Sequence, residues 1–232
     1  DLDHRDKVLD FEFDIVDNKT ISGKRISKAW AEEQHFYFYM QFSSAFKVDS
    51  TTLEGKRIYL DFGNHKDLEI RVGMSAVDVQ GAQLNLDKEI GNQSFEEIKS
   101  KTQNAWEKEL KKIQIYTPNQ DFLTVYYTAL YHSFLNPNVF SDVDGRYRGA
   151  DMKIHQTNDR QYTIFSLWDT FRATHPLFTL VQQERTEEFI RTFLRQYQHG
   201  GELPMWELAA NETGCMIGYH SIPVIVYAYM KV

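Results

Sequence analysis

The stretch His35-Phe-Tyr-Phe-Tyr-Met-Gln-Phe42 predicts a β-strand. Successive side chains of a strand point to opposite faces, so this run divides into two sets. One set is Phe36, Phe38, Met40 and Phe42, and the other is Tyr37, Tyr39 and Gln41. Aromatic residues favour strands, which supports this assignment. We therefore expect the chain to begin with β-structure.

Further strands are predicted on both sides of this one. They span Val8–Val16, Lys56–Phe62 and Leu68–Ala76, and turn-forming residues separate them. No helical period lies between the strands, which is typical of an antiparallel β-sandwich over residues 7–80. About five strands are too few to close a large sandwich. We therefore expect the N-terminal portion of this domain to lie outside the sequence.

The hydrophobic period changes after these strands. Ser94 followed by Glu97 is a capping box, which marks the N-terminus of a helix. Apolar residues follow helical spacing over residues 94–113. The many charged residues between them indicate a connecting helix that joins the β part to the C-terminal half of the chain.

From Asp121 onward the chain is predicted to be mostly helical. The expected helices are Asp121–Leu135, Ser166–Val181, Thr186–Gln198 and a stretch from near Asn211 toward Met230. Asn136-Pro137 would end the first helix and Gly200-Gly201 the third. The last helix would carry apolar residues that need partners, so we expect the helical part to be unfinished.

Composition and charge exclude several classes of protein. The chain has 232 residues, a formal charge of −7, 42% hydrophobic and 25% charged residues, which is ordinary for a globular protein. It carries no basic stripe for nucleic acid, and no apolar run of about 18 residues for a membrane span. Cys215 is the one cysteine, so no internal disulfide forms. The first residue is Asp1 rather than Met, so the absence of a signal peptide says little.

Two stretches mix tryptophan, carboxylate and amide side chains at the edges of apolar runs. They are Phe165-Ser-Leu-Trp-Asp-Thr-Phe-Arg-Ala-Thr-His-Pro-Leu177 and Gly200-Gly-Glu-Leu-Pro-Met-Trp-Glu-Leu-Ala-Ala-Asn-Glu-Thr-Gly-Cys-Met-Ile-Gly-Tyr-His220. A packed core does not need that mixture. A pocket for a sugar does, because aromatic faces cover its C–H side while charged and amide groups bind its hydroxyls. These stretches indicate a sugar-processing enzyme.

The same stretches resemble the family 92 glycoside hydrolases, the calcium-dependent exo-acting α-mannosidases of gut Bacteroides. The motifs that carry the resemblance occur in the family's order and cover nearly the whole chain. They are Arg25-Ile-Ser-Lys-Ala-Trp-Ala31, Ala129–Arg148, Trp168–His175, Gly201–His220 and Ile222–Met230. The chain departs from the family pattern at Tyr227, where an acidic residue is expected, and at Val232, where glycine is expected.

The resemblance implies a multidomain β plus α architecture. Residues 1–92 would be the C-terminal portion of an antiparallel β-sandwich, residues 93–118 a helical linker, and residues 119–232 the first helices of an (α/α)6 barrel catalytic domain. Family members are much longer than this chain, so it would hold only part of the sandwich and part of the barrel.

The resemblance also implies chemistry. Inverting hydrolysis needs a general acid and a second carboxylate that activates water, and the family uses a Glu, an Asp and a calcium ion. Its Glu-Gly-Asn and Asp-Asp-x-Gly-Gln motifs do not occur here. The sequence therefore assigns no catalytic residue and no metal ligand in this chain, and the calcium ligands are expected mostly outside it.

One acidic loop is a second candidate for a calcium site. The sequence Asp142-Val-Asp144-Gly145 is faintly like a calcium-binding loop, but Lys153 stands where an EF-hand has its Glu. We therefore expect a hairpin turn at Asp144-Gly145 instead.

By resemblance, Trp168 and Asp169 contact the terminal mannose. The Trp168 ring would cover a sugar face, and the Asp169 carboxylate would accept hydrogen bonds from two hydroxyls. Arg172 lies three residues later and would orient Asp169 from the same helix face. The alternative is a buried structural ion pair with Asp169 as a helix cap.

The second motif contributes Glu207, Asn211, Glu212 and Cys215 as further candidates for sugar contact. A structural alternative remains open for Asn211 as an N-cap and for Glu212 in the first turn of a helix. Cys215 is expected to line the pocket wall as a buried residue. It lies five residues from His220 on a predicted helix, so the two would not face each other as a nucleophile pair.

Three functions are compatible with these residues. The first is an exo-acting inverting α-mannosidase that cleaves mannose-containing glycans, with α-1,2 linkages as the favoured substrate. The second is a non-catalytic glycan-binding or scaffold protein of the same fold. The third is another (α/α)6 hydrolase that uses Asp169 or Glu207 directly. The resemblance places the protein in the periplasm or at the cell surface of a Gram-negative bacterium.

Overall fold

The chain folds into two compact units. A computed structural model describes residues 1–52, 55–65 and 67–231. Unit 1 consists of Asp1–Asn92, Phe140–Gln161 and Leu208–Thr213. Unit 2 consists of Gln93–Val139, Tyr162–Glu207 and the residues from Gly214 onward. Each unit is therefore assembled from segments that are distant in the sequence.

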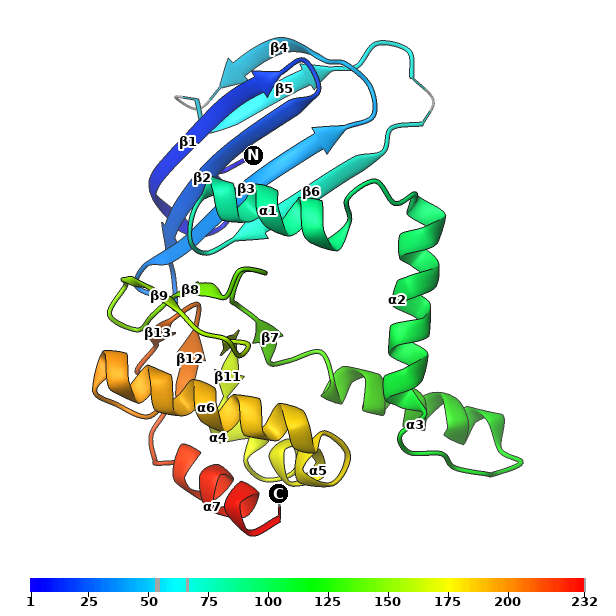
Figure 1. Ribbon diagram of the computed structural model, residues 1–232, viewed down its shortest axis with the longest axis vertical. Helices are drawn as coiled ribbons and strands as arrows, with labels where there is room; N and C mark the ends of the chain where they lie inside the picture. Colours follow the sequence, from blue (N-terminus) through cyan, green and yellow to red (C-terminus); the bar gives the residue numbers. More distant parts are fainter. Residues whose placement is uncertain (53–54, 66, 232) are drawn as a thin grey trace. The chain divides into compact units, whose positions relative to one another are not determined.

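Unit 1 is built on an antiparallel sheet with the strand order β1-β2-β3-β6 (Figure 1). Its strands are β1 (Lys7–Asp17), β2 (Thr20–Lys28), β3 (Gln34–Phe42) and β6 (Ile70–Ser75). A second antiparallel pair consists of β4 (Lys47–Thr52) and β5 (Arg57–Asp61). The antiparallel β-structure predicted for residues 7–80 is confirmed.

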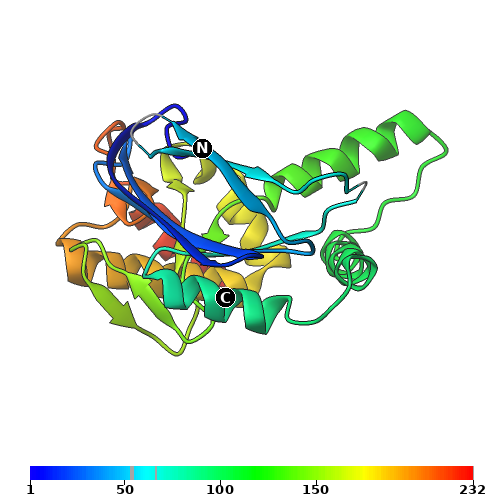
Figure 2. The same ribbon diagram turned by 90° about the horizontal axis from the view of Figure 1, so that it is seen from above.

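The alternation predicted for β3 is confirmed by its packing on two sides. Phe38 and Phe42 are buried, and the partly buried Leu60 of β5 packs against the same cluster. Tyr39, on the opposite face, packs against α1 (Val79–Glu89). Figure 2, seen from above, shows α1 lying along one face of the sheet. Both faces of β3 therefore carry buried side chains.

Helix α1 was not predicted, and its close packing depends on a glycine. A Cβ atom added at Gly73 of β6 would lie 2.0 Å from the carbonyl oxygen of Ala82 in α1. Only glycine lets the helix backbone approach the strand this closely. Asp78 caps the helix by accepting a hydrogen bond from the Gly81 N–H at 2.6 Å.

The segment 140–161 joins unit 1 through a buried carboxylate. Asp142 accepts hydrogen bonds from the Ser75 hydroxyl and the Asn85 side-chain amide, both at 2.8 Å. Burial raises the pKa of Asp142, and these two hydrogen bonds oppose that rise. Asp142, the first carboxylate of the acidic loop, therefore has a structural role.

The turn predicted at Asp144-Gly145 forms. Gly145 has a φ of +84°, and its N–H donates to the carbonyl of Asp142 at 2.9 Å. The next two strands, β8 (Arg146–Arg148) and β9 (Ile154–Gln156), pair with each other and are joined by a later turn. The buried Arg148 then donates to the carbonyl of Ala76 at 2.9 Å, which ties the hairpin to the end of β6.

Unit 2 is mainly helical. Its helices are α2 (Phe95–Leu110), α3 (Gln120–Ser133), α4 (Leu167–Thr170), α5 (Thr174–Val181), α6 (Gln183–Gly200) and α7 (Ser221–Lys231). Two short strand pairs join β7 (Asn138–Val139) to β10 (Tyr162–Thr163) and β11 (Phe165–Ser166) to β12 (Trp206–Leu208). The capping box of Ser94 and Glu97 is confirmed at the start of α2.

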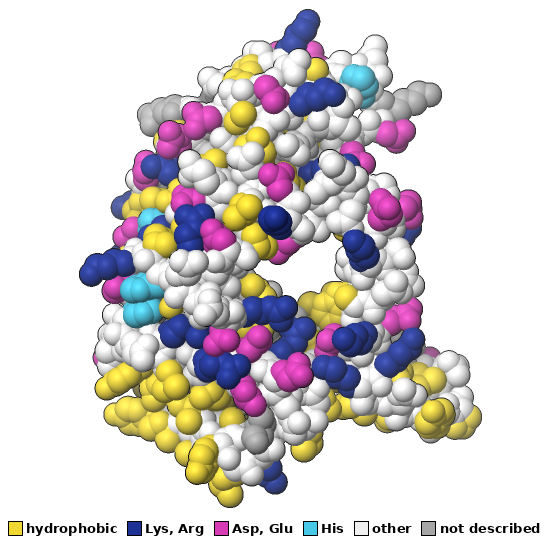
Figure 3. Space-filling view, in the orientation of Figure 1, with side chains coloured by type: hydrophobic (Ala, Val, Ile, Leu, Met, Phe, Trp, Pro, Cys, Tyr) yellow, Lys and Arg dark blue, Asp and Glu magenta, His cyan; other side chains and the backbone are white. Residues whose placement is uncertain are grey.

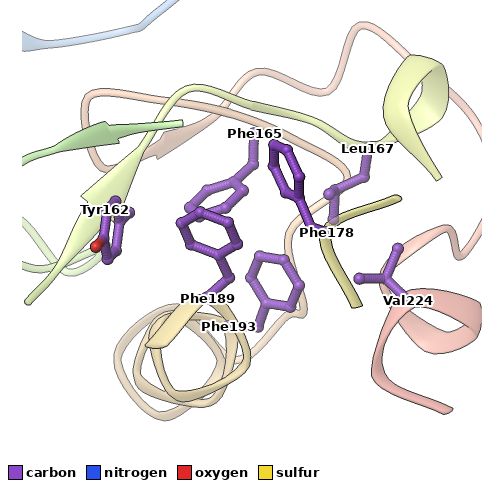
Figure 4. Packing of buried hydrophobic residues seen from close by; sticks show 7 residues of the cluster. All are labelled: Tyr162, Phe165, Leu167, Phe178, Phe189, Phe193 and Val224. Carbon is purple, nitrogen blue, oxygen red and sulfur yellow. The ribbon is translucent and has the colours of Figure 1, made fainter. Parts of the chain in front are cut away.

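The core of unit 2 is aromatic. Figure 4 shows its side chains gathered from β10 and β11 and from α4, α5, α6 and α7. They are Tyr162, Phe165, Leu167, Phe178, Phe189, Phe193 and Val224. Edge-to-face contacts dominate, with the rings of Phe165 and Phe193 4.8 Å apart at 78°. This core holds the first motif, because Phe165 and Leu167 both belong to it.

Two predicted helices are wrong. The stretch Ser166–Val181 is divided between α4 and α5, because Pro176 has no N–H to continue a helix and is tolerated in the first turn of a new one. The stretch from Asn211 is helical only from Ser221. Gly214 and Gly218 have φ values of +62° and +103°, which an α-helix does not allow.

Several apolar side chains of α7 lie on the surface of unit 2. Val224 is buried, but Ile222 and Val226 are each 49% exposed and Met230 is 74% exposed. Figure 3 shows hydrophobic side chains gathered over this part of the molecule.

His175 is buried in the aromatic core of unit 2. It is 3% exposed, and its ring lies edge-on to those of Phe178 and Phe189, 5.9 and 6.2 Å away. Its Nδ1 atom is buried without a hydrogen-bond partner among the described residues. Burial lowers the pKa of His175 to about 4. The folded protein therefore holds this imidazole neutral at pH 7.

Replacing His175 with leucine is expected to reduce the acid sensitivity of unit 2. In the unfolded chain His175 takes up a proton near pH 6.5, but in the folded chain it does so only near pH 4. The contribution of neutral His175 to stability is therefore complete above pH 6.5 and is lost as the pH falls toward 4. The separation corresponds to about 3 kcal/mol. Urea denaturation at pH 7 and pH 4.5 measures this loss in both proteins. The exposed His132 provides the control as His132→Leu, and identical pH profiles for all three proteins would refute the expectation.

Candidate functional site

The first motif forms an exposed cluster at α4. Asp169 is exposed, and its carboxylate accepts a hydrogen bond from the Ser166 hydroxyl, one turn earlier. The Thr170 hydroxyl donates to the carbonyl of Ser166 at 3.0 Å. Ser166 thus holds the Asp169 carboxylate at the start of a short helix, where its other acceptor positions face solvent.

Arg172 binds aromatic rings rather than Asp169. Its guanidinium lies 4.9 Å from the centre of the Trp168 ring and 4.6 Å from that of Phe171, and it donates to the Trp168 carbonyl. The expected orientation of Asp169 by Arg172 is wrong, because α4 ends at Thr170 and the two residues do not share a helix face. Cation–π contacts fix the guanidinium against Trp168 instead.

His220 brings the end of the second motif to this cluster. Its ring centre lies 4.5 Å from that of Phe171. Gly218 has a φ of +103°, a conformation that other residues rarely adopt, so glycine is favoured at that position. Phe171 and His220 were not predicted as site residues, since no spacing in the sequence links them.

Glu207 is buried and holds the main chain beside the first motif. It is 3% exposed, and it accepts hydrogen bonds from the Thr163 hydroxyl at 2.8 Å and from the Ile164 N–H at 3.1 Å. Ile164 has a φ of +67°, which is unfavourable for a β-branched residue. The carboxylate therefore stabilises a strained turn directly before Phe165.

Asn211 lies in β13 (Asn211–Glu212) of unit 1 and clamps another loop. Its side chain accepts a hydrogen bond from the Glu33 N–H and donates one to the Glu33 carbonyl, both at 3.1 Å. It also donates to the carbonyl of Ala209 at 2.8 Å. The alternative role of Asn211 as an N-cap is wrong, because no helix starts there. Glu212 follows it and is half-buried.

Cys215 is exposed, so the expectation of a buried pocket-wall residue is wrong. It precedes α7 and does not share a helix with His220. Five of the predicted site residues belong to unit 2, namely Trp168, Asp169, Arg172, Glu207 and Cys215. Of these, the structure brings Trp168, Asp169 and Arg172 into one local cluster, while Asn211 and Glu212 belong to unit 1.

The Asp169 cluster does not by itself form a calcium site. Calcium takes about six to eight oxygen ligands, carboxylates among them. The hydrogen-bonded neighbour that the described residues give Asp169 is the hydroxyl of Ser166. One carboxylate with a hydroxyl is too small a donor set, so most ligands of a calcium ion would have to come from elsewhere.

In residues 1–52, 55–65 and 67–231, no helix combines the length and the apolar character that crossing a bilayer requires.

Solved structures similar to this chain include two mannosidases. The α-mannosidase BT3965 from Bacteroides thetaiotaomicron is 32% identical, with a TM-score of 0.82, and the match covers 95% of this chain and 35% of that one. The complex of the same enzyme with mannoimidazole matches with a TM-score of 0.81, 32% identity and coverage of 95% and 34%. The inverting mannosidase BT2199 from Bacteroides thetaiotaomicron VPI-5482 matches with 26% identity, a TM-score of 0.82 and coverage of 95% and 32%.

The chain thus spans about a third of the length of these relatives. No curated protein matches its sequence. The model of the glycosyl hydrolase family 92 catalytic domain matches residues 81–232. That match covers residues 165–177 and 200–220, the two stretches that mix tryptophan, carboxylate and amide side chains. Together with the similar structures it shows that the chain belongs to glycoside hydrolase family 92.

Proposed function

We propose that the chain is part of an exo-acting inverting α-mannosidase that releases mannose from glycans, with α-1,2 linkages as the preferred substrate. The observation that carries this proposal is the family 92 match together with the fold shared with two mannosidases. One of those relatives is described as inverting. The other was solved in complex with mannoimidazole.

The chain's own contribution is part of the subsite for the terminal mannose. Trp168 presents an aromatic surface, and Asp169 presents an exposed carboxylate that Ser166 holds in place. Charged acceptors form strong hydrogen bonds with hydroxyl groups. Arg172 stacks on Trp168 and would fix the ring for contact with the sugar.

The other candidates take different roles in this proposal. Glu207 and Asn211 position main chain, since their polar atoms bind backbone groups. Glu212 and Cys215 would face the glycan from the second motif. No residue of this chain is the catalytic acid or base, and calcium would be held mostly by residues elsewhere in the enzyme.

The proposed organisation is that of the family. Residues 1–92 would belong to a β-sandwich domain, residues 93–118 to a linker and residues 119–232 to the start of the (α/α)6 barrel. The enzyme would act in the periplasm or at the cell surface, where glycans are accessible.

Replacing Asp169 with asparagine tests the role of this chain. The change keeps the shape but removes the charge, so mannoimidazole binding to the 232-residue chain is expected to weaken about 10- to 100-fold. Isothermal titration calorimetry measures the affinity, and Asp121→Asn at the exposed start of α3 is the matched control. Equal affinity of the Asp169 variant and the unchanged chain would remove Asp169 from the subsite.

Release of mannose from α-1,2-mannobiose by the full-length enzyme, and by its Asp169→Asn variant, tests the activity. Chelator-sensitive release supports an α-mannosidase. If Asp169→Asn abolishes turnover while binding persists, Asp169 is itself catalytic, as in a different (α/α)6 hydrolase. Binding without any release of mannose would support a non-catalytic glycan-binding protein.

A further inference from the structure

Unit 2 contains a pocket whose lining does not include the cluster of Trp168, Asp169 and Arg172. Its volume is about 450 Å³, and it lies between α2, the chain after α3, and α5 and α6. Trp106, Phe134 and Pro137 form part of its apolar wall, and Glu109, Gln182 and Arg185 form its polar wall. None of its lining residues belongs to the predicted sugar subsite. Ligand pockets of small molecules have volumes of about 300 to 1,000 Å³.

The polar wall is a preformed network around a buried amide. Gln182 is 5% exposed, accepts a hydrogen bond from the Lys112 ammonium at 2.7 Å and donates one to the Glu109 carboxylate at 2.6 Å. Glu109 also pairs with Lys112 at 2.8 Å and lies 3.7 Å from the Arg185 guanidinium. Side chains that already hold one another in place lose little conformational freedom when a ligand binds.

Glu109 is ionised within this network. Burial raises its pKa, but the hydrogen bonds from Lys112 and Gln182 more than offset that rise, so its pKa lies below the ordinary value. Lys112 and Gln182 donate to this carboxylate, and a carboxylate has about four acceptor positions, so it can accept further hydrogen bonds. It is therefore suited to accept hydrogen bonds from hydroxyl groups.

The apolar wall presents an aromatic ring from an otherwise exposed helix. Helix α2 buries none of its residues, yet Trp106 is half-buried at the pocket. Its ring centre lies 4.5 Å from that of Tyr131 on α3, at an angle of 54°. The indole is thus fixed beside the polar network, without being part of the core of unit 2.

We propose that this pocket is a second, non-catalytic binding site for a hexopyranose unit of the glycan. A pyranose has an apolar C–H face that fits Trp106, and hydroxyls that fit Glu109, Gln182 and Arg185. The identity of the sugar as mannose rests on the proposed function. A small anion is the rival ligand, because Lys108 and Arg185 line the pocket together with Glu109.

The tryptophans provide the test. The chain has 4 Trp, so an amide-correlation NMR spectrum contains one indole N–H signal for each of Trp30, Trp106, Trp168 and Trp206, assignable with Trp→Phe variants. Titration with methyl α-D-mannopyranoside is expected to shift the Trp106 signal with a dissociation constant in the millimolar range, about 1 to 10 mM. The Gln182 side-chain amide signal should shift over the same range.

Variants then separate the pocket from the predicted subsite. Trp106→Ala is expected to weaken the titration seen at Gln182 about tenfold. Phe95→Ala is the matched control, because Phe95 lies on the same helix, is 65% exposed and does not line the pocket. Since α2 buries none of its residues, neither variant should unfold the chain, and circular dichroism checks this.

The contrary outcomes are distinct. A Trp168 signal that shifts while Trp106 and Gln182 stay fixed overturns the second site and leaves the proposed function intact. Inorganic phosphate that reproduces the Trp106 shift and blocks the mannoside shows an anion site instead. If no signal shifts, the second site is refuted and the terminal-mannose subsite loses support as well.

Discussion

Replacing Phe193 with alanine is expected to lower the free energy of unfolding of unit 2 by about 4 kcal/mol. Phe193 is 0% exposed, and its ring lies 4.8 Å from that of Phe165, which starts the first motif. Truncation removes most of a buried aromatic side chain and leaves a cavity that the surrounding rings cannot fill without moving. The loss should therefore also loosen the segment that carries Trp168.

Urea denaturation followed by tryptophan fluorescence measures this change, with circular dichroism as a second probe. Leu194→Ala is the matched control, because Leu194 is the next residue of α6 and is 49% exposed. It is expected to cost less than about 1 kcal/mol. A Phe193 variant no less stable than the Leu194 variant would contradict the described core.

Replacing Glu207 with alanine is expected to destabilise unit 2 by about 3 to 4 kcal/mol. The change leaves the Thr163 hydroxyl and the Ile164 N–H without the carboxylate that both bind. Each buried polar group that loses its partner costs about 1 to 3 kcal/mol, and a cavity adds to this. The strained φ of Ile164 would also lose its support.

Glu207→Gln distinguishes structural support from sugar contact. Glutamine keeps the shape and one acceptor oxygen, so it should recover about half of the lost stability. If Glu207 only positions main chain, mannoimidazole affinity should follow stability in this variant. Loss of affinity in a fully stable Gln variant would instead identify direct contact with the sugar. Glu202→Ala, at an exposed position after α6, is the control for both measurements.

Elements defined by neighbouring residues could be predicted from the sequence. The period-2 alternation of His35–Phe42 identified β3, and the capping box of Ser94 identified the start of α2. Gly201 ends α6 in a left-handed conformation with a φ of +82°, as the glycine pair indicated. Each of these signals acts over a few residues, so no knowledge of the tertiary structure is needed.

Helix boundaries inside the motifs could not be predicted. Apolar residues in Ser166–Val181 follow helical spacing, yet packing of Phe165 and Leu167 into the core and the missing N–H of Pro176 divide the run. Tertiary contacts outweigh helix propensity, because a propensity is worth only a fraction of a kcal/mol per residue. Because α4 ends at Thr170, Arg172 lies outside that helix and packs on Trp168 and Phe171 instead of orienting Asp169.

The sequence by itself determined the family of this protein, the order of its β and helical parts, and the types of residue in its two motifs. Only the tertiary structure decided what those residues contact. Asn211 binds the main chain of Glu33, 178 positions away, and Gln182 joins α2 to the start of α6. Such contacts depend on where the whole chain places two segments, which no local pattern encodes. The chemistry of a carboxylate or amide can therefore be read from the sequence, but the groups that it binds are known only from the tertiary structure.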